Sequence, residues 1–342
     1  EAARSLVSDA APDDNQRAMA AALKDADKAT VLLGNTAAAH PQASLLRALA
    51  TVIADAAGAT NGCLPAAANS IGGWLAGALP HRGPAGQAVQ SAGLAAHAMC
   101  DSPRKGYILF GVEPENDCWD GEAAMKAIDE ADFVVSFSPW ASETMMNSAD
   151  VLLPVAPFTE TSGTFVNLEG RWQGFTGVAR PHGDSRPGWK VLRVLGNLLE
   201  LDGFEYTSSE EIRDALRCEV DAASFEPGSA DVAAAPSTGK GELERVGDVP
   251  IHSSDALVRR APSLQATPDA MAGNVARIST RQAEASGVLG ADTIKASQDG
   301  TSITVSLEID ERVPAGCIWL PAGTPAAAGL GPCIGAIRIE RA

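Results

Sequence analysis

Polar side chains that could bind a ligand are concentrated in one loop, which follows an apolar run at 151–153. This Val-Leu-Leu run is typical of a strand buried on both faces of a parallel sheet, and Pro154 and Pro157 end it. Open α/β folds bind ligands at the carboxyl edge of the sheet, so the loop is the first candidate site. Its residues offer hydroxyl, carboxylate, amide and guanidinium groups: Thr159, Glu160, Ser162, Gly163, Thr164, Asn167, Glu169 and Arg171.

Two details of this loop lead to specific predictions. Glu169 and Arg171 are two residues apart and would point to opposite sides of an extended segment, so separate partners are expected rather than a direct ion pair. Gly163 is expected to be a sensitive position if its φ is positive. The polar groups of the loop could also satisfy one another and the backbone, because buried polar groups are normally hydrogen-bonded.

The rest of the sequence matches no motif for catalysis or metal binding. The six cysteines contain no C-x-x-C and the five histidines are scattered, so we predict no metal site and free, buried thiols in a reducing compartment. The sequence also lacks a G-x-x-x-x-G-K-[ST], a G-x-G-x-x-G and a G-x-S-x-G motif. We therefore predict no catalytic residue in this chain.

The elements that must position the loop alternate between strands and helices. A β-α-β-α-β order implies a parallel sheet with right-handed crossovers, so the predicted fold class is α/β with a doubly wound, mostly parallel sheet. Asp13 or Asp14 is expected to cap a first helix, and Ser208 with Glu211 forms a capping box for a later one. Strands are predicted at 30–33, 107–110, 133–137 and 151–153, and helices from 41, at 122–131 and at 189–201.

The last part of the chain changes character. A stretch at 226–241 rich in Pro, Gly, Ala and Ser is typical of an interdomain linker. Apolar and polar residues then alternate strictly over 302–310, which indicates a half-exposed strand and, with its neighbours, a small β-barrel or β-sandwich. The predicted organisation is an α/β domain at 1–225, a linker and arm at 226–272, and a small barrel-like C-terminal domain at 273–342.

Several of these stretches resemble a known family. The segments ADVLLP and FTETSGTFVNLEGRWQ, followed by Gly-Asp-Ser-Arg at 183–186 and Trp189, resemble the signature of the molybdopterin-oxidoreductase superfamily. The strand and loop at 106–111 with Glu113-Pro114 resemble that family's strand before a cofactor-facing loop. Within the superfamily, the pattern is most similar to the large iron–sulfur subunits of NADH:quinone oxidoreductase (respiratory complex I).

The resemblance implies a scaffold rather than a redox centre. Molybdenum enzymes use such loops to hold a pterin guanine dinucleotide, whereas complex I subunits keep the loop without that cofactor, so we expect no cofactor here and only vestigial loop residues. The resemblance places iron–sulfur clusters in an N-terminal portion of the full-length subunit, and the chain, which begins Glu-Ala-Ala without a methionine, is expected to be a fragment without that portion. The implied partners are other subunits of the peripheral arm of complex I, at the cytoplasmic face of the inner membrane.

Composition and charge argue against several classes of binding partner. A net charge of -17 argues against nucleic acid and anionic membrane surfaces as partners, and no apolar run is long enough for membrane insertion. Two other functions stay open at this stage. The chain could belong to an active molybdopterin oxidoreductase of the formate dehydrogenase or nitrate reductase type, or it could be a nucleotide-binding or interaction module on a Rossmann-like sheet.

Overall fold

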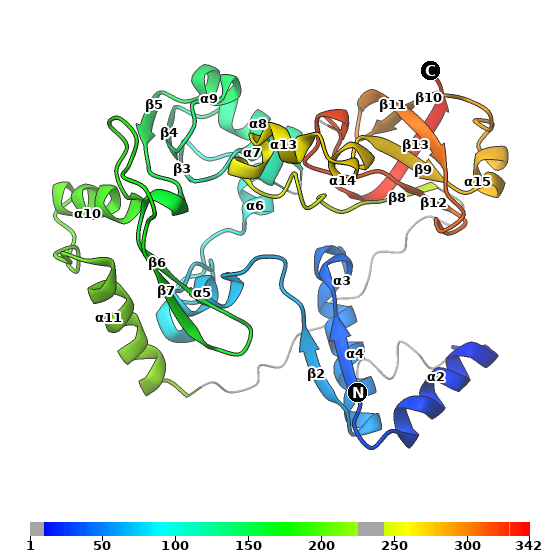
Figure 1. Ribbon diagram of the computed structural model, residues 1–342, viewed down its shortest axis with the longest axis horizontal. Coiled ribbons are helices and arrows are strands. Elements are labelled where there is room, and N and C mark those ends of the chain that lie inside the picture. Colours follow the sequence, from blue (N-terminus) through cyan, green and yellow to red (C-terminus); the bar gives the residue numbers. More distant parts are fainter. Residues whose placement is uncertain (1–9, 119, 225–242, 328) are drawn as a thin grey trace. The chain divides into compact units, whose positions relative to one another are not determined.

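The computed structural model describes residues 10–118, 120–224, 243–327 and 329–342 (Figure 1). These residues form two compact units, the first consisting mainly of 10–70 and the second of 71–223 with 243–342. The predicted linker at 226–241 lies outside the described residues. Within the described ranges, no helix combines the length and the apolar character needed to cross a membrane.

The first unit is a pair of parallel strands joined by helices. β1 and β2 pair from Thr30 opposite Thr60 onward, and Ala50 and Ala54 of the connecting α4 are buried. Asp13 caps α2 by accepting a hydrogen bond from the backbone N–H of Gln16, which confirms the predicted cap. The elements are α2 (Asp14–Asp25), β1 (Thr30–Leu33), α3 (Asn35–Ala39), α4 (Ala43–Ala57) and β2 (Thr60–Cys63).

The second unit contains a three-stranded parallel sheet in the order β3-β4-β5 (Figure 1). The middle strand is the most buried, with Val134 and Phe137 each 1% exposed. Asp150, just before β5, accepts a hydrogen bond from the Val134 N–H at 2.7 Å. The elements of this part are α5 (Ser70–Leu75), η1 (Pro84–Gly86), α6 (Ala96–Asp101), β3 (Gly106–Phe110), α7 (Pro114–Asp117), α8 (Gly121–Asp129), β4 (Phe133–Ser138), α9 (Glu143–Ser148) and β5 (Val151–Pro154).

The α/β class with parallel strands is therefore confirmed, but the strands do not form one sheet in the described residues. β1 pairs with β2 in the first unit, and β3, β4 and β5 pair in the second. The apolar run at 151–153 locates a strand, but β5 lies at the edge of this sheet and these residues are only half-buried, so the prediction of burial on both faces is wrong. The choice of strand partner is a contact between distant residues, which no local pattern reveals.

A β-hairpin and two longer helices follow the sheet. β6 pairs antiparallel with β7, with Gly163 opposite Phe175. The Ser208 hydroxyl accepts a hydrogen bond from the Glu211 N–H at 3.2 Å, as the S-x-x-E pattern predicts. These elements are η2 (Phe158–Glu160), β6 (Gly163–Val166), β7 (Trp172–Phe175), α10 (Gly188–Leu198) and α11 (Ser209–Ala222).

The C-terminal part of the second unit is a closed six-stranded barrel in the order β10-β11-β9-β12-β8-β13. Its core is formed by fully buried side chains such as Ile278, Ile294, Ile318 and Leu320. The elements are β8 (Leu243–Val246), α12 (Ala256–Arg259), α13 (Pro262–Gln265), α14 (Pro268–Ala272), β9 (Val275–Ile278), α15 (Thr280–Ala285), β10 (Thr293–Gln298), β11 (Thr301–Ile309), β12 (Cys317–Trp319), η3 (Pro325–Ala327) and β13 (Ile334–Arg341).

The barrel extends beyond the predicted range of 273–342. β8 comes from the segment predicted to be linker and arm, and it pairs with both β12 and β13. Its sequence is Leu-Glu-Arg-Val, and Arg245 is the buried residue of the strand. A short strand whose buried position is an arginine shows no apolar alternation, so the sequence pattern did not reveal it.

Candidate functional site

Asn167 organises the turn between β6 and β7. Its side-chain oxygen accepts hydrogen bonds from the backbone N–H groups of Glu169 and Arg171, at 3.1 and 2.9 Å. Gly170 has a φ of 74°, a conformation that glycine adopts without steric cost. The amide predicted as a ligand donor therefore serves the backbone of its own turn.

The other polar residues of the loop are also tied to neighbouring segments. The Glu160 carboxylate accepts a hydrogen bond from the His182 N–H at 3.0 Å, and the hydroxyls of Ser162 and Ser209 lie 2.6 Å apart. The Thr159 carbonyl accepts from the N–H of Val178 at 2.8 Å. These contacts connect the loop to the segment after β7 and to the start of α11.

Two predictions about this loop are wrong in their reasoning. Glu169 and Arg171 approach each other, with 3.8 Å between carboxylate oxygen and guanidinium nitrogen, because the segment turns at Gly170 instead of being extended. Both side chains are largely exposed, so this ion pair contributes little. Gly163 is not among the residues with positive φ; it is constrained by the Phe175 ring, which would lie 2.6 Å from an added Cβ.

The predicted loop residues do not converge on a single cavity. Only Gly163 and Thr164 line a pocket, of about 340 Å³, together with the hairpin and the start of α11. Arg213 in its wall is paired with Asp214 at 2.7 Å. Asn167, Glu160 and Ser162 thus make hydrogen bonds within the protein, and a purely structural role for the loop stays a prediction.

A cavity of about 360 Å³ lies instead at the carboxyl edge of the β3-β4-β5 sheet. Gly111 and Ser138, at the ends of β3 and β4, contribute to its floor, and Pro157 and Phe158 lie beside it. Part of its wall comes from a distant part of the chain, Ser254–Leu257. This is the edge where the parallel strands were predicted to present a site, but the residues that line it are different.

A charge cluster fastens this distant segment to the sheet edge. Glu113, only 4% exposed, accepts a hydrogen bond from Arg259 at 2.8 Å on one carboxylate oxygen and from Arg260 at 2.5 Å on the other. Arg259 also donates to Asp117 at 2.9 Å. The guanidinium of Arg260 lies over the Trp140 ring, 5.0 Å from its centre.

The cluster changes the acidity of Glu113. Burial by itself would raise the pKa of this carboxyl group, but the hydrogen bonds from Arg260 and Arg259 and their positive charges outweigh burial and hold the pKa below its ordinary value. The pKa of Arg259 is raised, because Asp117 and Glu113 outweigh the opposing effect of its burial. Glu113 is therefore a carboxylate with both oxygens occupied at neutral pH.

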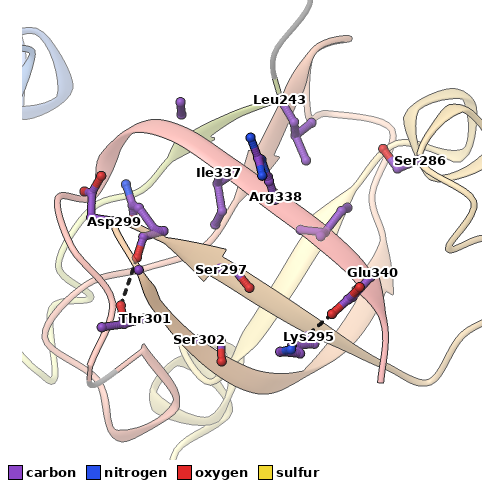
Figure 2. A pocket seen from close by; sticks show the side chains of 14 residues that line it. Leu243, Ser286, Lys295, Ser297, Asp299, Thr301, Ser302, Ile337, Arg338 and Glu340 are labelled. Atoms are coloured by element: carbon purple, nitrogen blue, oxygen red, sulfur yellow. Dashed lines mark hydrogen bonds and ion pairs between the residues drawn. The ribbon is translucent and has the colours of Figure 1, made fainter.

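A larger groove of about 930 Å³ lies on the outer side of β10, β11 and β13 (Figure 2). Figure 2 shows Lys295 and Glu340 directed toward each other, and their charged atoms are 3.2 Å apart. The groove is open and its lining is about equally polar and apolar, and none of the predicted site residues lines it. In the described part of the chain, no group of three or more His, Cys, Asp or Glu side chains could hold a metal ion.

Comparison with known proteins identifies the family. The family model for Molybdopterin oxidoreductase matches residues 14–198, which is more than half of the chain. The chain therefore belongs to the molybdopterin oxidoreductase family, as its signature segments suggested.

Relatives of two kinds are among its matches. An NADH-quinone oxidoreductase subunit of Streptomyces coelicolor is 27% identical over 271 residues, which cover 72% of this chain and 29% of the relative. A Staphylococcus aureus protein described as a formate dehydrogenase is 37% identical over 90 residues, 26% of this chain and 9% of the relative. The chain thus spans less than a third of either relative. Among solved structures, acetylene hydratase from Pelobacter acetylenicus has a TM-score of 0.49 at 15% identity, covering 77% of this chain and 48% of that one.

The sheet edge does not suit the pterin dinucleotide of the molybdenum enzymes. Phosphate groups are usually held by arginine, lysine or the start of a helix. Here the cavity is lined by the carboxylates of Glu113, Asp117 and Asp255, and no described arginine or lysine lines it. The two nearby arginines are already paired with Glu113 and Asp117. Among the described residues that line this edge, none offers an anionic cofactor an unpaired arginine or lysine.

Sequence reasoning missed the residues that define this edge. Glu113 was singled out only as part of a family-like step, and Arg259-Arg260 fell in the segment predicted to be linker and arm. One signal was available, because two adjacent arginines are conspicuous in an arm of a chain with a net charge of -17. Their partners lie more than 140 residues earlier, which no local pattern reveals.

Proposed function

We propose that this chain is a scaffold portion of an iron–sulfur subunit of the NADH-quinone oxidoreductase type, without a redox centre of its own. The similarity to the Streptomyces coelicolor relative supports this, since it extends over 72% of the chain, whereas the formate dehydrogenase match covers 26%. The observation that carries the proposal is the pairing of Glu113 with Arg259 and Arg260. It pairs with the chain's own arginines the carboxylate that follows the strand and loop resembling the family's cofactor-facing loop.

In this role the chain would supply rigid surface to an assembly. The closed barrel and the sheet are joined by the Glu113 cluster, so a neighbouring subunit would meet one body in the second unit rather than two loosely connected ones. The proposed partners are other subunits of the peripheral arm, and the proposed location is the cytoplasmic face of the inner membrane.

The test is a measurement of cofactor content and of assembly. We expect the purified chain to contain iron and molybdenum far below one atom per chain and to release no fluorescent pterin after oxidation. We also expect it to associate with other peripheral-arm subunits when they are expressed together. A pterin recovered in a one-to-one ratio would overturn the proposal.

A second candidate function is a part of a working molybdopterin oxidoreductase. It is favoured by the higher identity, 37%, to the formate dehydrogenase relative over a short segment. On this hypothesis, the wild-type chain would bind the pterin dinucleotide in a direct titration, whereas on the scaffold hypothesis it would not. A module unrelated to this family is no longer supported, given the family match.

A further inference from the structure

The sheet edge has the features of a receptor for two adjacent arginines. Each oxygen of Glu113 accepts from a different guanidinium, and Asp117 takes a second nitrogen of Arg259. Trp140 supplies an aromatic face for Arg260. Lysine could not replace either arginine equally well, since an ammonium group has no planar fork and stacks less well on a ring.

The segment that occupies this receptor is organised by its own contacts. Asp255 caps the short α12 by accepting hydrogen bonds from the N–H groups of Leu257 and Val258. The Gln265 amide donates to the carbonyls of His252 and Val258 at 2.8 and 2.9 Å. These bonds present Arg259 and Arg260 together at the end of a preformed strap, residues 252–260.

The fit of the strap is incomplete. The Nε–H of Arg259 is buried without a hydrogen-bond partner. A cavity of about 360 Å³ also remains between the strap and the sheet edge. An occupant from another molecule could satisfy the free donor and fill the space, so the strap is not the best ligand that this edge could hold.

We propose that the edge formed by Glu113, Asp117 and Trp140 is a binding site for an Arg-Arg segment, and that the strap is its built-in occupant. A partner protein with two adjacent arginines in an exposed segment would compete with the strap and release it. The chain's net charge of -17 favours the approach of such a basic segment. This inference does not depend on the proposed role in complex I.

The experiment adds the strap sequence to the chain as a separate peptide. The full chain with Arg259→Ala and Arg260→Ala would be titrated with a fluorescent peptide of residues 252–261, followed by anisotropy. We expect saturable binding that is weaker by about tenfold or more when the peptide's arginines are replaced by lysine. Adding Glu113→Gln to the chain should abolish binding. The proposal would be overturned if the folded double variant did not bind the peptide. It would also be overturned if the variant still bound the peptide after Glu113→Gln was added.

Two controls separate the site from general electrostatics and from misfolding. The side chains of Arg281 and Arg338 are exposed and make no hydrogen bond or ion pair within the described residues, so Arg281→Ala with Arg338→Ala removes the same charge elsewhere. That variant should bind the peptide no better than the wild type.

If the double variant does not fold, hydrogen exchange on the wild-type chain still tests the proposed binding site. Excess arginine peptide should increase hydrogen exchange at residues 252–260, and the lysine peptide should not. Unchanged exchange with the arginine peptide would count against the receptor.

Discussion

Among the residues that the structure describes, Arg245 is the largest fully buried side chain, at 1% exposed. Its guanidinium donates to the carbonyls of Leu320, Pro321 and Gly331 and to the side chain of Gln298, at 2.7–3.0 Å. Burial lowers the pKa of Arg245 to about 10, which still leaves it a cation at neutral pH. No carboxylate of the described residues forms an ion pair with it, so neutral dipoles stabilise its charge.

Arg245 therefore connects β8 to the loops that follow β12 and precede β13. We expect Arg245→Ala to lower the free energy of unfolding by at least about 3 kcal/mol, because several buried acceptors each lose a donor at about 1–3 kcal/mol. Arg245→Lys should recover little, since an ammonium group cannot span these acceptors. Denaturant unfolding followed by circular dichroism measures the effect. The control, Arg312→Ala on the surface, should change stability by less than about 0.5 kcal/mol.

Gly163 remains a predicted sensitive position, but through a close contact rather than through a positive φ. A Cβ at this position would lie 2.6 Å from the Phe175 ring, which packs edge-on against Phe165 at 5.1 Å. We predict that Gly163→Ala lowers the free energy of unfolding by about 1–3 kcal/mol through overpacking. Phe175→Leu in the same chain should relieve part of this cost. The matched control is Gly174→Ala in the partner strand, whose Cβ would meet nothing closer than 3.6 Å. Equal effects at the two glycines would show that the ring is not the cause.

At the scale of elements, the strap is held to the sheet edge by a carboxyl group with a lowered pKa. Glu113 binds its proton more weakly when the strap is docked than when it is free, so docking is fully stabilised above the ordinary value near 4.5 and is lost as the pH falls through the lowered value. Arg259, Arg260 and Asp117 are the other charged groups that face it.

We therefore predict acid release of the strap. Hydrogen exchange at residues 252–260, corrected for the intrinsic effect of pH, should be slow at pH values near neutral and should accelerate below the ordinary carboxyl range. Glu113→Gln should raise exchange at neutral pH and flatten this pH dependence. If the variant kept the wild-type profile, another group would have to hold the strap.

At the scale of the whole molecule, charge decides which partners are excluded. With a net charge of -17, the chain repels the phosphate backbone, and binding to nucleic acid normally depends on neutralising it. We expect no binding to double-stranded DNA in fluorescence anisotropy even at low salt, where such attraction is strongest. A basic protein run in parallel shows that the assay responds. Saturable, salt-sensitive binding by the chain would contradict the prediction.

The sequence alone determined those features that depend on neighbours in the chain. Apolar runs marked β1, β3, β4 and β5, strict alternation marked β11, and the caps at Asp13 and Ser208 are where their patterns predicted them. These features are visible in the sequence because helix caps, strand alternation and turns are satisfied within a few residues.

The tertiary structure alone decided what the polar residues do. Asn167 and Glu160 had the right chemistry for a ligand but are used by nearby backbone N–H groups. The role of Glu113 depends on the hydrogen bonds that it accepts from Arg259 and Arg260. The charge of Arg245 is stabilised by backbone carbonyls more than 70 residues away. The physical reason is that a charge leaves water only where the fold supplies partners for it, and those partners are brought together by long-range packing, which no local pattern encodes.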